Sequence, residues 1–182
     1  MKKRIGIFGG TFNPIHIGHI KMAEATRKEY RLSCVYFIPC GIPPHRSKKD
    51  LLPAKLRYDL VKKAIRGKKY FKALDVEIKK KRKAYTIDTI NKLRKNKLSI
   101  LNPQSSIFFL IGQDEFEKLH RWEKARELAK LVIFLVLPRL KRKIKPPDFG
   151  TSGPPDLKWH LVHTKPINIS STEIRKRLKN YL

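Results

Sequence analysis

Six short apolar runs divide the 182-residue chain, and their pattern restricts its fold more than any other feature. The runs are Arg4–Phe8, Cys34–Pro39, Ala73–Ile78, Ser106–Ile111, Leu131–Leu137 and Trp159–His163. Two of them, "IFFLI" and "LVIFLVL", show no alternation of apolar and polar residues. A strand that is apolar on both faces is typical of a parallel sheet covered by helices on both sides.

Segments with helical features separate these runs. Pro53 suits the first turn of one of them, Gly67 follows its end, and Ile87, Ile90 and Leu93 share one face of another. The expected helices are His19–Tyr30, Pro53–Ile65, Thr86–Lys95, Asp114–Lys130 and Ser171–Lys179. The order β-α-β-α-β-α-β-α-β-β-α predicts a single α/β domain over residues 1–182, built on a doubly wound parallel sheet.

The composition narrows the class of protein. A hydrophobic content of 41% supports a folded core, and the two cysteines, Cys34 and Cys40, lie in or beside an apolar run. We expect both to be reduced in a cytoplasmic protein. The apolar run behind the N-terminal Lys-Lys-Arg is shorter than a signal peptide requires, and no run is long enough to span a membrane. We therefore expect no membrane partner.

The net charge of +28 is extreme for this length. A charge of this sign favours polyanions or phosphorylated small molecules as partners. The alternative is a solvated, lysine-rich surface without a specific partner. A nucleic-acid-binding protein is a rival interpretation, but the sequence has no helix-turn-helix signature, zinc finger or aromatic run of an RNA-binding sheet.

The stretch "GGTFNPIHIGH" (9–19) stands between the first expected strand and the first expected helix. In an open parallel sheet, ligands bind beyond the carboxyl ends of the strands, where the strand order reverses. The two glycines let backbone amides approach a ligand, and a helix that begins near Ile17 offers N–H groups suited to phosphate. The i, i+3 spacing of His16 and His19 lets both rings face one anion.

Other interpretations of this stretch are weaker or remain open. The sequence has neither the G-x-x-x-x-G-K-[ST] of a P-loop nor the G-x-G-x-x-G of a dinucleotide fold. A metal site is a weak interpretation of the histidine pair, because no carboxylate or third histidine stands nearby. An ordinary turn with two helix-capping histidines stays open as an alternative.

Two motifs at opposite ends of the chain carry a resemblance. "GTFNPIHIGH" resembles the (H/T)-x-G-H signature of the nucleotidyltransferase superfamily, and "ISSTEIRKRL" (169–178) resembles its I-S-S-T-x-I-R motif. The resemblance implies a Rossmann-like nucleotidyltransferase fold, in which His16, His19 and Arg175 are the catalytic residues around a nucleoside triphosphate. Without the first motif, the capping-box spacing of Ser170 and Glu173 would indicate only an ordinary capped helix.

Three central segments favour one family within the superfamily. "IPPHRSK" (42–48), "AYTIDTI" (84–90) and "IGQDEFEKLHRW" (111–122) resemble, in order, segments of nicotinate mononucleotide adenylyltransferases. That resemblance implies transfer of AMP from ATP to nicotinate mononucleotide, giving deamido-NAD and pyrophosphate in NAD biosynthesis. The corresponding amide mononucleotide and other phosphorylated acceptors stay open as alternatives.

The resemblance also implies a set of binding residues and a Mg²⁺ ion held mainly by the ATP phosphates. For ATP the residues are Gly9, Gly10, Thr11, Phe12, Gly18, Gly112, Asp114, Ile169, Ser171 and Thr172. For the mononucleotide they are His45, Arg46, Tyr85, Thr86, Trp122 and Arg139. Simpler alternatives are a core position for Trp122, a helix N-cap for Asp114 and a solvated loop for His45 and Arg46.

The sequence departs from the family pattern in two places. Asn13 replaces the aspartate of the usual G-T-F-D-P, and we expect it to make a hydrogen bond that stabilises the turn. The usual R-P-G after the fifth strand is replaced by "LPRLKRK", where Arg139 is the candidate for the phosphate-binding role.

Overall fold

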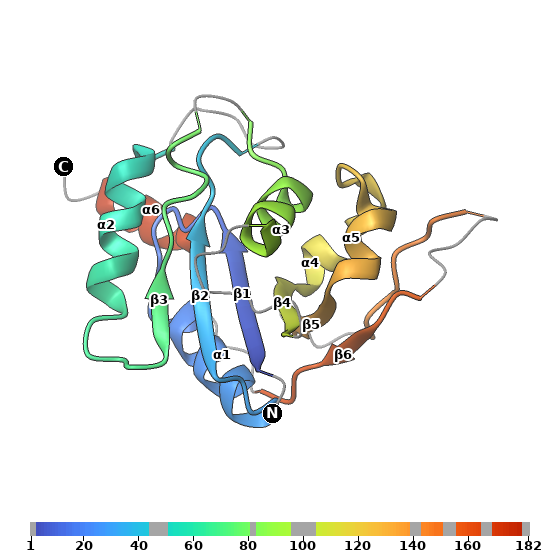
Figure 1. Cartoon of the computed structure of the whole chain (residues 1–182). Coiled ribbons are helices and arrows are strands. Elements are labelled where there is room, and N and C mark those ends of the chain that lie inside the picture. Colours follow the sequence, from blue (N-terminus) through green and yellow to red (C-terminus); the bar gives the residue numbers. More distant parts are fainter. Residues whose placement is uncertain are drawn as a thin grey trace.

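Six parallel strands form one sheet in the computed structural model, which describes residues 3–43, 51–80, 83–95, 105–138, 143–150, 156–164 and 169–179. In chain order the strands are β1 (Arg4–Gly10), β2 (Cys34–Pro39), β3 (Phe71–Ala73), β4 (Ser106–Gly112), β5 (Ile133–Leu137) and β6 (Trp159–Leu161). Across the sheet their order is β3-β2-β1-β4-β5-β6 (Figure 1). The prediction of a doubly wound parallel sheet is confirmed.

The strand order reverses beside β1. The chain first adds β2 and then β3 on one side of β1, and it returns to place β4 on the other side. β1 and β4 pair in parallel from Arg4 opposite Ser106 to Phe8 opposite Leu110. The connections that follow their carboxyl ends therefore diverge at the reversal point, which is where open α/β sheets bind ligands.

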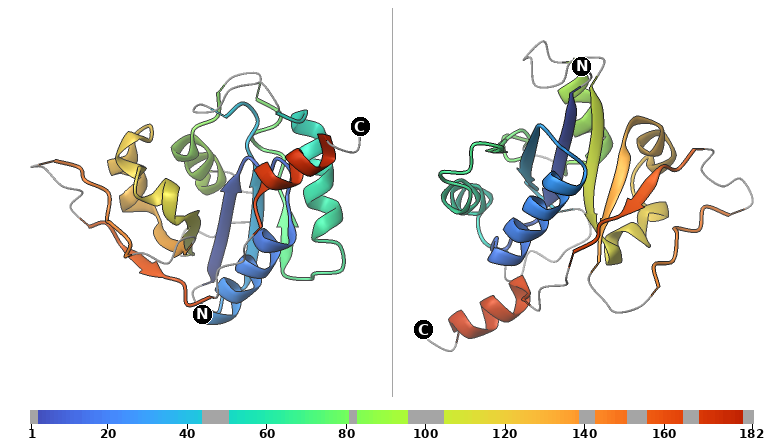
Figure 2. Two further views of the ribbon diagram at one scale, coloured as in Figure 1. Left: turned by 180° about the vertical axis from the view of Figure 1, so that it is seen from behind. Right: turned by 90° about the horizontal axis from the view of Figure 1, so that it is seen from below.

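Helices cover both faces of the sheet (Figures 1 and 2). α1 and α2 pack on one face, while α3, α4 and α5 pack on the other, and α6 lies on the same side as α1. The bounds are α1 (Ile17–Glu29), α2 (Ala54–Ala64), α3 (Thr86–Lys95), α4 (Gln113–Phe116), α5 (Ala125–Leu131) and α6 (Ser171–Lys179), with a 3₁₀ turn η1 (Leu119–Arg121). No helix in these described ranges is long and apolar enough to cross a membrane.

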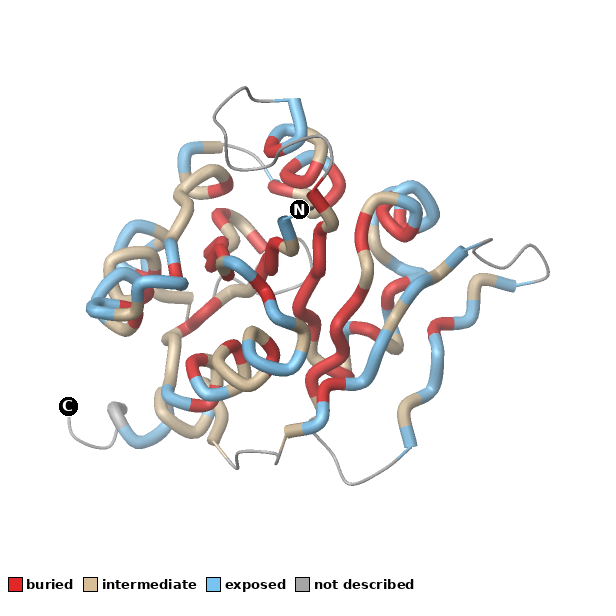
Figure 3. The backbone as a smooth tube through the Cα atoms, turned by 60° about the horizontal axis from the view of Figure 1, so that its bottom comes forward, coloured by how far each residue is buried: buried red, intermediate tan, exposed pale blue. Residues whose placement is uncertain are grey.

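The strands carry the core, as the lack of alternation predicts. The five residues at 107–111 are each at most 3% exposed, and they alternate between two apolar clusters on opposite faces of the sheet. Figure 3 shows the central strands as continuously buried, whereas the helices bury only one side. The sheet is therefore a rigid platform, and the segments that leave its carboxyl edge are held at fixed places.

The strand predicted at Ala73–Ile78 is wrong in its position. β3 covers Phe71–Ala73, and the chain then turns through 76–79. Two backbone hydrogen bonds close this turn. The amide of Lys79 donates to the carbonyl of Asp75, and the amide of Lys80 donates to the carbonyl of Glu77. The partly buried Leu74 and Val76 pack against the core just before and within this turn, so the sequence there looks like that of a strand.

The single helix predicted at Asp114–Lys130 is also wrong, because the segment is broken into α4, η1 and α5. Trp122 has an extended backbone, with φ −79° and ψ 146°, and Lys124 has a positive φ of 51°. Phe116 and Leu119 still point into the core, as their spacing predicts. The break turns the chain at Trp122, whose side chain reaches the cavity at the carboxyl edge of the sheet.

Candidate active site

A cavity of about 450 Å³ opens at the reversal point of the sheet. This volume lies within the range of small-molecule sites, roughly 300–1,000 Å³. Most of the residues predicted from the sequence line it: Gly9, Gly10, Thr11, Phe12, His16, Gly18, His19, Tyr85, Thr86, Gly112, Trp122, Ile169, Ser171 and Thr172. Segments from opposite ends of the chain thus form one wall.

His16 and His19 lie together at the start of α1. Their ring centroids are 3.8 Å apart, with an angle of 32° between the planes. The backbone amide of His16 donates a hydrogen bond to Nδ1 of His19 at 3.2 Å. Because Nδ1 accepts this bond, the neutral His19 ring carries its hydrogen on Nε2, which makes Nε2 a donor for an anion in the cavity.

Two neighbours fix the orientation of these rings. Phe12 is 3% exposed, and its ring meets that of His19 edge-on at 5.2 Å. A Cβ added at Gly18 would lie 2.9 Å from Nδ1 of His16, so the ring occupies the space that any larger residue would need. The phenylalanine and the glycine of the motif therefore shape the histidine pair as well as lining the cavity.

The second motif meets the first across the opening of the cavity. Oγ of Ser171 donates to the carbonyl of Pro14 at 2.9 Å, and the Arg175 guanidinium donates to the carbonyl of Asn13 at 2.6 Å. The amide of Glu173 donates to Oγ of Ser170, as the capping-box spacing predicts. These bonds place the N-terminus of α6 beside the N-terminus of α1, and both helix ends favour negative charge.

The other end of the cavity is assembled from α3 and the broken segment at 112–123. The half-buried Trp122 packs edge-on against Phe109 at 6.1 Å, and it also lines the cavity. Tyr85 and Thr86 line the cavity from the start of α3. Trp122 therefore combines a core contact with a surface that a ligand reaches.

Several predicted residues are not part of the lining. Arg175 is absent from the lining, but its guanidinium donates to the carbonyl of Asn13 and to Oγ1 of the lining residue Thr172. Asp114 is in the first turn of α4, but Glu115 lines the cavity instead, and the N-cap is Gly112, so the N-cap interpretation of Asp114 is wrong. His45, Arg46 and Arg139 lie outside the described residues.

Asn13 makes a structural hydrogen bond, as expected, but the bond joins its turn to another connection. Its side-chain oxygen accepts a hydrogen bond at 2.9 Å from the amide of Leu52, at the far end of the β2–α2 connection. The side chain is almost fully buried, at 6% exposed. Asparagine thus serves as an acceptor here, the part that an aspartate oxygen would also play.

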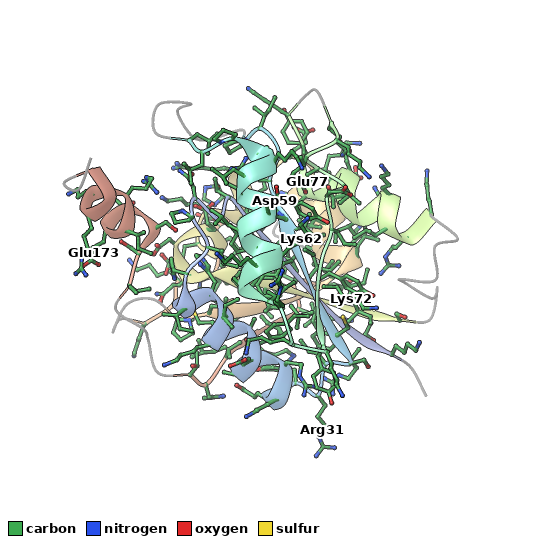
Figure 4. The ribbon with its side chains drawn as sticks, turned by 90° about the vertical axis from the view of Figure 1, so that its left-hand side faces the viewer. Arg31, Asp59, Lys62, Lys72, Glu77 and Glu173 are labelled. Atoms are coloured by element: carbon green, nitrogen blue, oxygen red, sulfur yellow. The ribbon has the colours of Figure 1, made fainter. Side chains whose placement is uncertain are left out.

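Sequence reasoning missed Glu77 and Arg57. Glu77 lines the cavity and belongs to the segment that follows β3. Figure 4 labels it beside the upper part of α2. It was missed because the sequence analysis placed it within the strand predicted at Ala73–Ile78. Arg57 is 0% exposed, and its i, i+4 relation to the buried Val61 is a signal that it sits on the apolar face of α2.

Burial gives Glu77 an unusual titration. Loss of solvent raises its pKa from 4.5 to about 7, although hydrogen bonds from Thr89 and Cys40 and the charge of Lys80 act in the opposite direction. Oγ1 of Thr89 donates to Oε1 of Glu77 at 2.8 Å. The wall of the cavity therefore gains a negative charge as the pH rises through about 7.

The donor groups suit an ion that arrives with a ligand. Within the described ranges, no group of three or more His, Cys, Asp and Glu side chains could hold a metal ion. The cavity is lined by single carboxylates such as Glu115 and Glu123. Mg²⁺ prefers oxygen ligands and keeps several waters, so an ion bound chiefly by phosphate oxygens fits this lining.

Comparisons with known proteins agree on one kind of enzyme. The family described as cytidylyltransferase-like matches residues 7–177. A protein of Dehalococcoides mccartyi, named "Probable nicotinate-nucleotide adenylyltransferase", is 38% identical over 179 residues, covering 97% of this chain and 86% of the relative. A protein of the same name from Shouchella clausii is 39% identical over 176 residues, with 97% and 84% covered.

Solved structures show the same fold. The nicotinic acid mononucleotide adenylyltransferase of Plasmodium falciparum in complex with NaAD superposes with a TM-score of 0.75 at 21% identity, covering 96% of this chain and 83% of that one. Its complex with APC gives a TM-score of 0.71 at 20% identity, with the same coverage.

Proposed function

This chain belongs to the nicotinate-nucleotide adenylyltransferases within the cytidylyltransferase-like family, and from that membership we propose how its cavity performs the reaction. The enzyme joins the AMP moiety of ATP to nicotinate mononucleotide, and the products are deamido-NAD and pyrophosphate. We further propose that residues 1–182 act as one domain in the cytoplasm, with ATP and nicotinate mononucleotide as the partners.

One observation carries the placement of the triphosphate. The N-termini of α1 and α6, which come from opposite ends of the chain, meet at the reversal point of the sheet through the bond between Ser171 and Pro14. His16 and His19 stand at the same place. Two helix N-termini and two imidazoles in one wall are a strong donor set for phosphate oxygens.

The reaction needs no general base. The phosphate of the mononucleotide is an anion at neutral pH, so it attacks the α-phosphorus of ATP directly and in line. The new P–O bond forms as the bond to the pyrophosphate oxygen breaks, and pyrophosphate leaves with that electron pair. Catalysis then depends on alignment and on stabilising the charge that develops on the phosphates.

His19 is the strongest candidate for stabilising that charge. The bond from the His16 amide fixes the ring and leaves the hydrogen of the neutral ring on Nε2. The ring of His16 lies beside it, with the centroids 3.8 Å apart, so both rings can face the same phosphate oxygens as charge develops on them.

Mg²⁺ enters the reaction as part of the substrate, MgATP. When bound, it supplies charge neutralisation between phosphate oxygens. The residues that would hold it are Glu115 and the backbone around Gly112, which line the cavity at the end of β4. Arg175, whose guanidinium donates to the Asn13 carbonyl and to Thr172, is the third residue of this proposal that stabilises charge on the phosphates.

The mononucleotide occupies the opposite end of the cavity. A pyridinium ring is flat and cationic, and the exposed face of Trp122 is suited to stack on it. Tyr85 and Thr86 offer a hydroxyl, backbone amides and a helix start to the ring carboxylate. The contributions of His45, Arg46 and Arg139 to the phosphates remain part of the proposal.

A panel of acceptors tests this function. The protein is mixed with ATP, Mg²⁺ and one phosphorylated acceptor at a time, including nicotinate mononucleotide and its amide, and pyrophosphate release is measured. We expect the acid mononucleotide to give the highest kcat/KM. Pyrophosphate release with another acceptor but none with either mononucleotide would contradict the proposal.

A further inference from the structure

Arg57 is the largest side chain that is fully buried in the described part of the chain. Its guanidinium donates to four backbone carbonyls. Nη1 reaches Thr11 at 2.7 Å and Cys40 at 2.6 Å, Nη2 reaches Gly41 at 2.8 Å, and Nε reaches Leu52 at 3.0 Å. A single rigid group thus holds four separate points of the backbone.

These carbonyls belong to the segments that shape the cavity. Thr11 is in the connection from β1 to α1, beside the histidine motif. Cys40 and Gly41 begin the connection from β2 to α2, and Leu52 lies near its end. Arg57 therefore joins the start and the end of the second connection to the middle of the first.

Further bonds run between the same two connections. The amide of Cys40 donates to the carbonyl of Gly10 at 2.8 Å, and the amide of Leu52 donates to the side chain of Asn13 at 2.9 Å. On its other side, the turn at Gly41 touches Glu77: an added Cβ would lie 2.4 Å from the Glu77 carbonyl oxygen. The start of the second connection is thus enclosed between Arg57 and Glu77.

The charge of Arg57 makes a simple packing role a poor explanation. No described carboxylate forms an ion pair with it, and a buried charge is costly unless fixed dipoles replace water. The planar guanidinium of arginine points its N–H donors in fixed, divergent directions. The ammonium of a lysine has its donors on a single nitrogen and cannot reach carbonyls that are so far apart. This geometry suits a group whose task is to hold several carbonyls in a fixed relation.

We propose that Arg57 is a positioning residue that holds the β1–α1 connection and the two described ends of the β2–α2 connection in one relative geometry around the two substrates. The inference rests on the proposed function, because it assigns the first connection to ATP and the second to the phosphates of the acceptor. Arg57 touches neither substrate. It acts through the carbonyls of Thr11, Cys40 and Gly41.

The test compares Arg57→Lys with Val61→Ala, a variant of a fully buried apolar residue one turn further along α2. Lysine keeps the charge but cannot reach all four carbonyls. A misplacement of about 1 Å costs on the order of 100-fold in rate, so we expect kcat of Arg57→Lys to fall by roughly that factor. Val61→Ala should keep its kcat within about threefold at a similar loss of thermal stability.

Amide hydrogen exchange provides a readout that needs no turnover. In Arg57→Lys we expect the amides of Cys40 and Leu52 to exchange at least about tenfold faster than in Val61→Ala, while the amides of β4 exchange alike. A failure of wild-type protein to release pyrophosphate would overturn the proposed function, yet the exchange comparison would still decide on Arg57.

Two results would overturn the inference. One is a kcat or an exchange pattern of Arg57→Lys that matches Val61→Ala. The other is a failure of Arg57→Lys, Arg57→Gln and Arg57→Met all to fold, because Arg57 would then serve the stability of the whole domain.

Discussion

The two ends of the cavity are built in different ways. The phosphate end comes mainly from one short stretch, 9–19, whose residues contact one another: Phe12 and Gly18 shape the rings of His19 and His16. The acceptor end is assembled from Glu77, the start of α3 and the broken segment around Trp122. Local contacts shape the histidine pair of the first end, to which the fold adds only the start of α6, whereas the second end consists of separate segments throughout.

The largest effect is expected from His19→Ala at the phosphate end. Removing one preorganised donor to a transition-state anion typically costs about 10²–10³ in kcat. We expect a loss of this size in pyrophosphate release, with an unchanged circular dichroism spectrum. His160→Ala, at an exposed position on β6, is the matched control. If His19→Ala released pyrophosphate at a rate close to that of the control, His19 would have no part in catalysis.

The next largest effect is expected on stability at the acceptor end. The pKa of Glu77 is about 7 in the folded protein, against 4.5 for an unperturbed glutamate, so the folded state binds the proton more tightly. Stability contributed by the protonated carboxyl is present below about pH 4.5 and is lost as the pH rises to about 7. Above that range the charged, buried carboxylate costs about 3 kcal/mol.

Glu77→Gln keeps an oxygen that accepts from Thr89 but removes this charge. We expect urea unfolding at about pH 8 to show a gain of about 3 kcal/mol over wild type, which shrinks toward zero near about pH 4.5. Glu123→Gln replaces an exposed carboxylate of the same cavity and should show no such trend. An equal gain from Glu77→Gln at both pH values would mean that the charge is not responsible.

A smaller effect on rate is expected from Gly18→Ala. This variant tests whether contacts within the stretch 9–19 shape the histidine pair. The new Cβ would lie 2.9 Å from Nδ1 of His16, so the ring must move. We expect kcat to fall by about tenfold, corresponding to roughly 1.4 kcal/mol. Alanine is the better helix former, so the unfolding temperature should not fall. Lys21→Ala, on the exposed side of α1, controls for the change in helix propensity.

The smallest effect is expected from Trp122→Ala. Aromatic contacts contribute about 0.5–1.5 kcal/mol beyond their buried area, so KM for the mononucleotide should rise about three- to tenfold. KM for ATP should change less, and Trp122→Phe should restore most of the difference. Equal increases in KM for both substrates would mean that Trp122 serves only to pack against Phe109.

The fold was predictable from the sequence because burial on both faces leaves a local trace. The unbroken run at 107–111 predicts a covered strand, and the structure buries every residue of it. The misplaced β3 and the broken helix arise where tertiary contacts decide the backbone. The packing of the partly buried Val76 against the core from a turn, and the positive φ of Lys124, have no local signature in the sequence.

The residues of the candidate site likewise fall into those that the sequence revealed and those that only the folded chain revealed. The stretch 9–19 was identifiable because a helix start, glycines and histidine spacing carry chemical meaning within a few residues, whereas the segment 169–172 was identified through its resemblance to a family motif. Arg57 and Glu77 were missed, because an arginine among many cations and a glutamate in an apolar run look ordinary until the chain closes around them. The raised pKa of Glu77 in particular arises from burial, which exists only in the folded chain and outweighs the opposing hydrogen bonds of Thr89 and Cys40.

A structure of the protein with a non-hydrolysable ATP analogue and Mg²⁺ would decide whether the two helix starts and the histidine pair bind the triphosphate. We expect the β- and γ-phosphates to lie between Nε2 of His19 and the N-terminus of α6, at the carboxyl ends of β1 and β4. A triphosphate bound elsewhere, with His16 and His19 touching no phosphate oxygen, would contradict this mechanism.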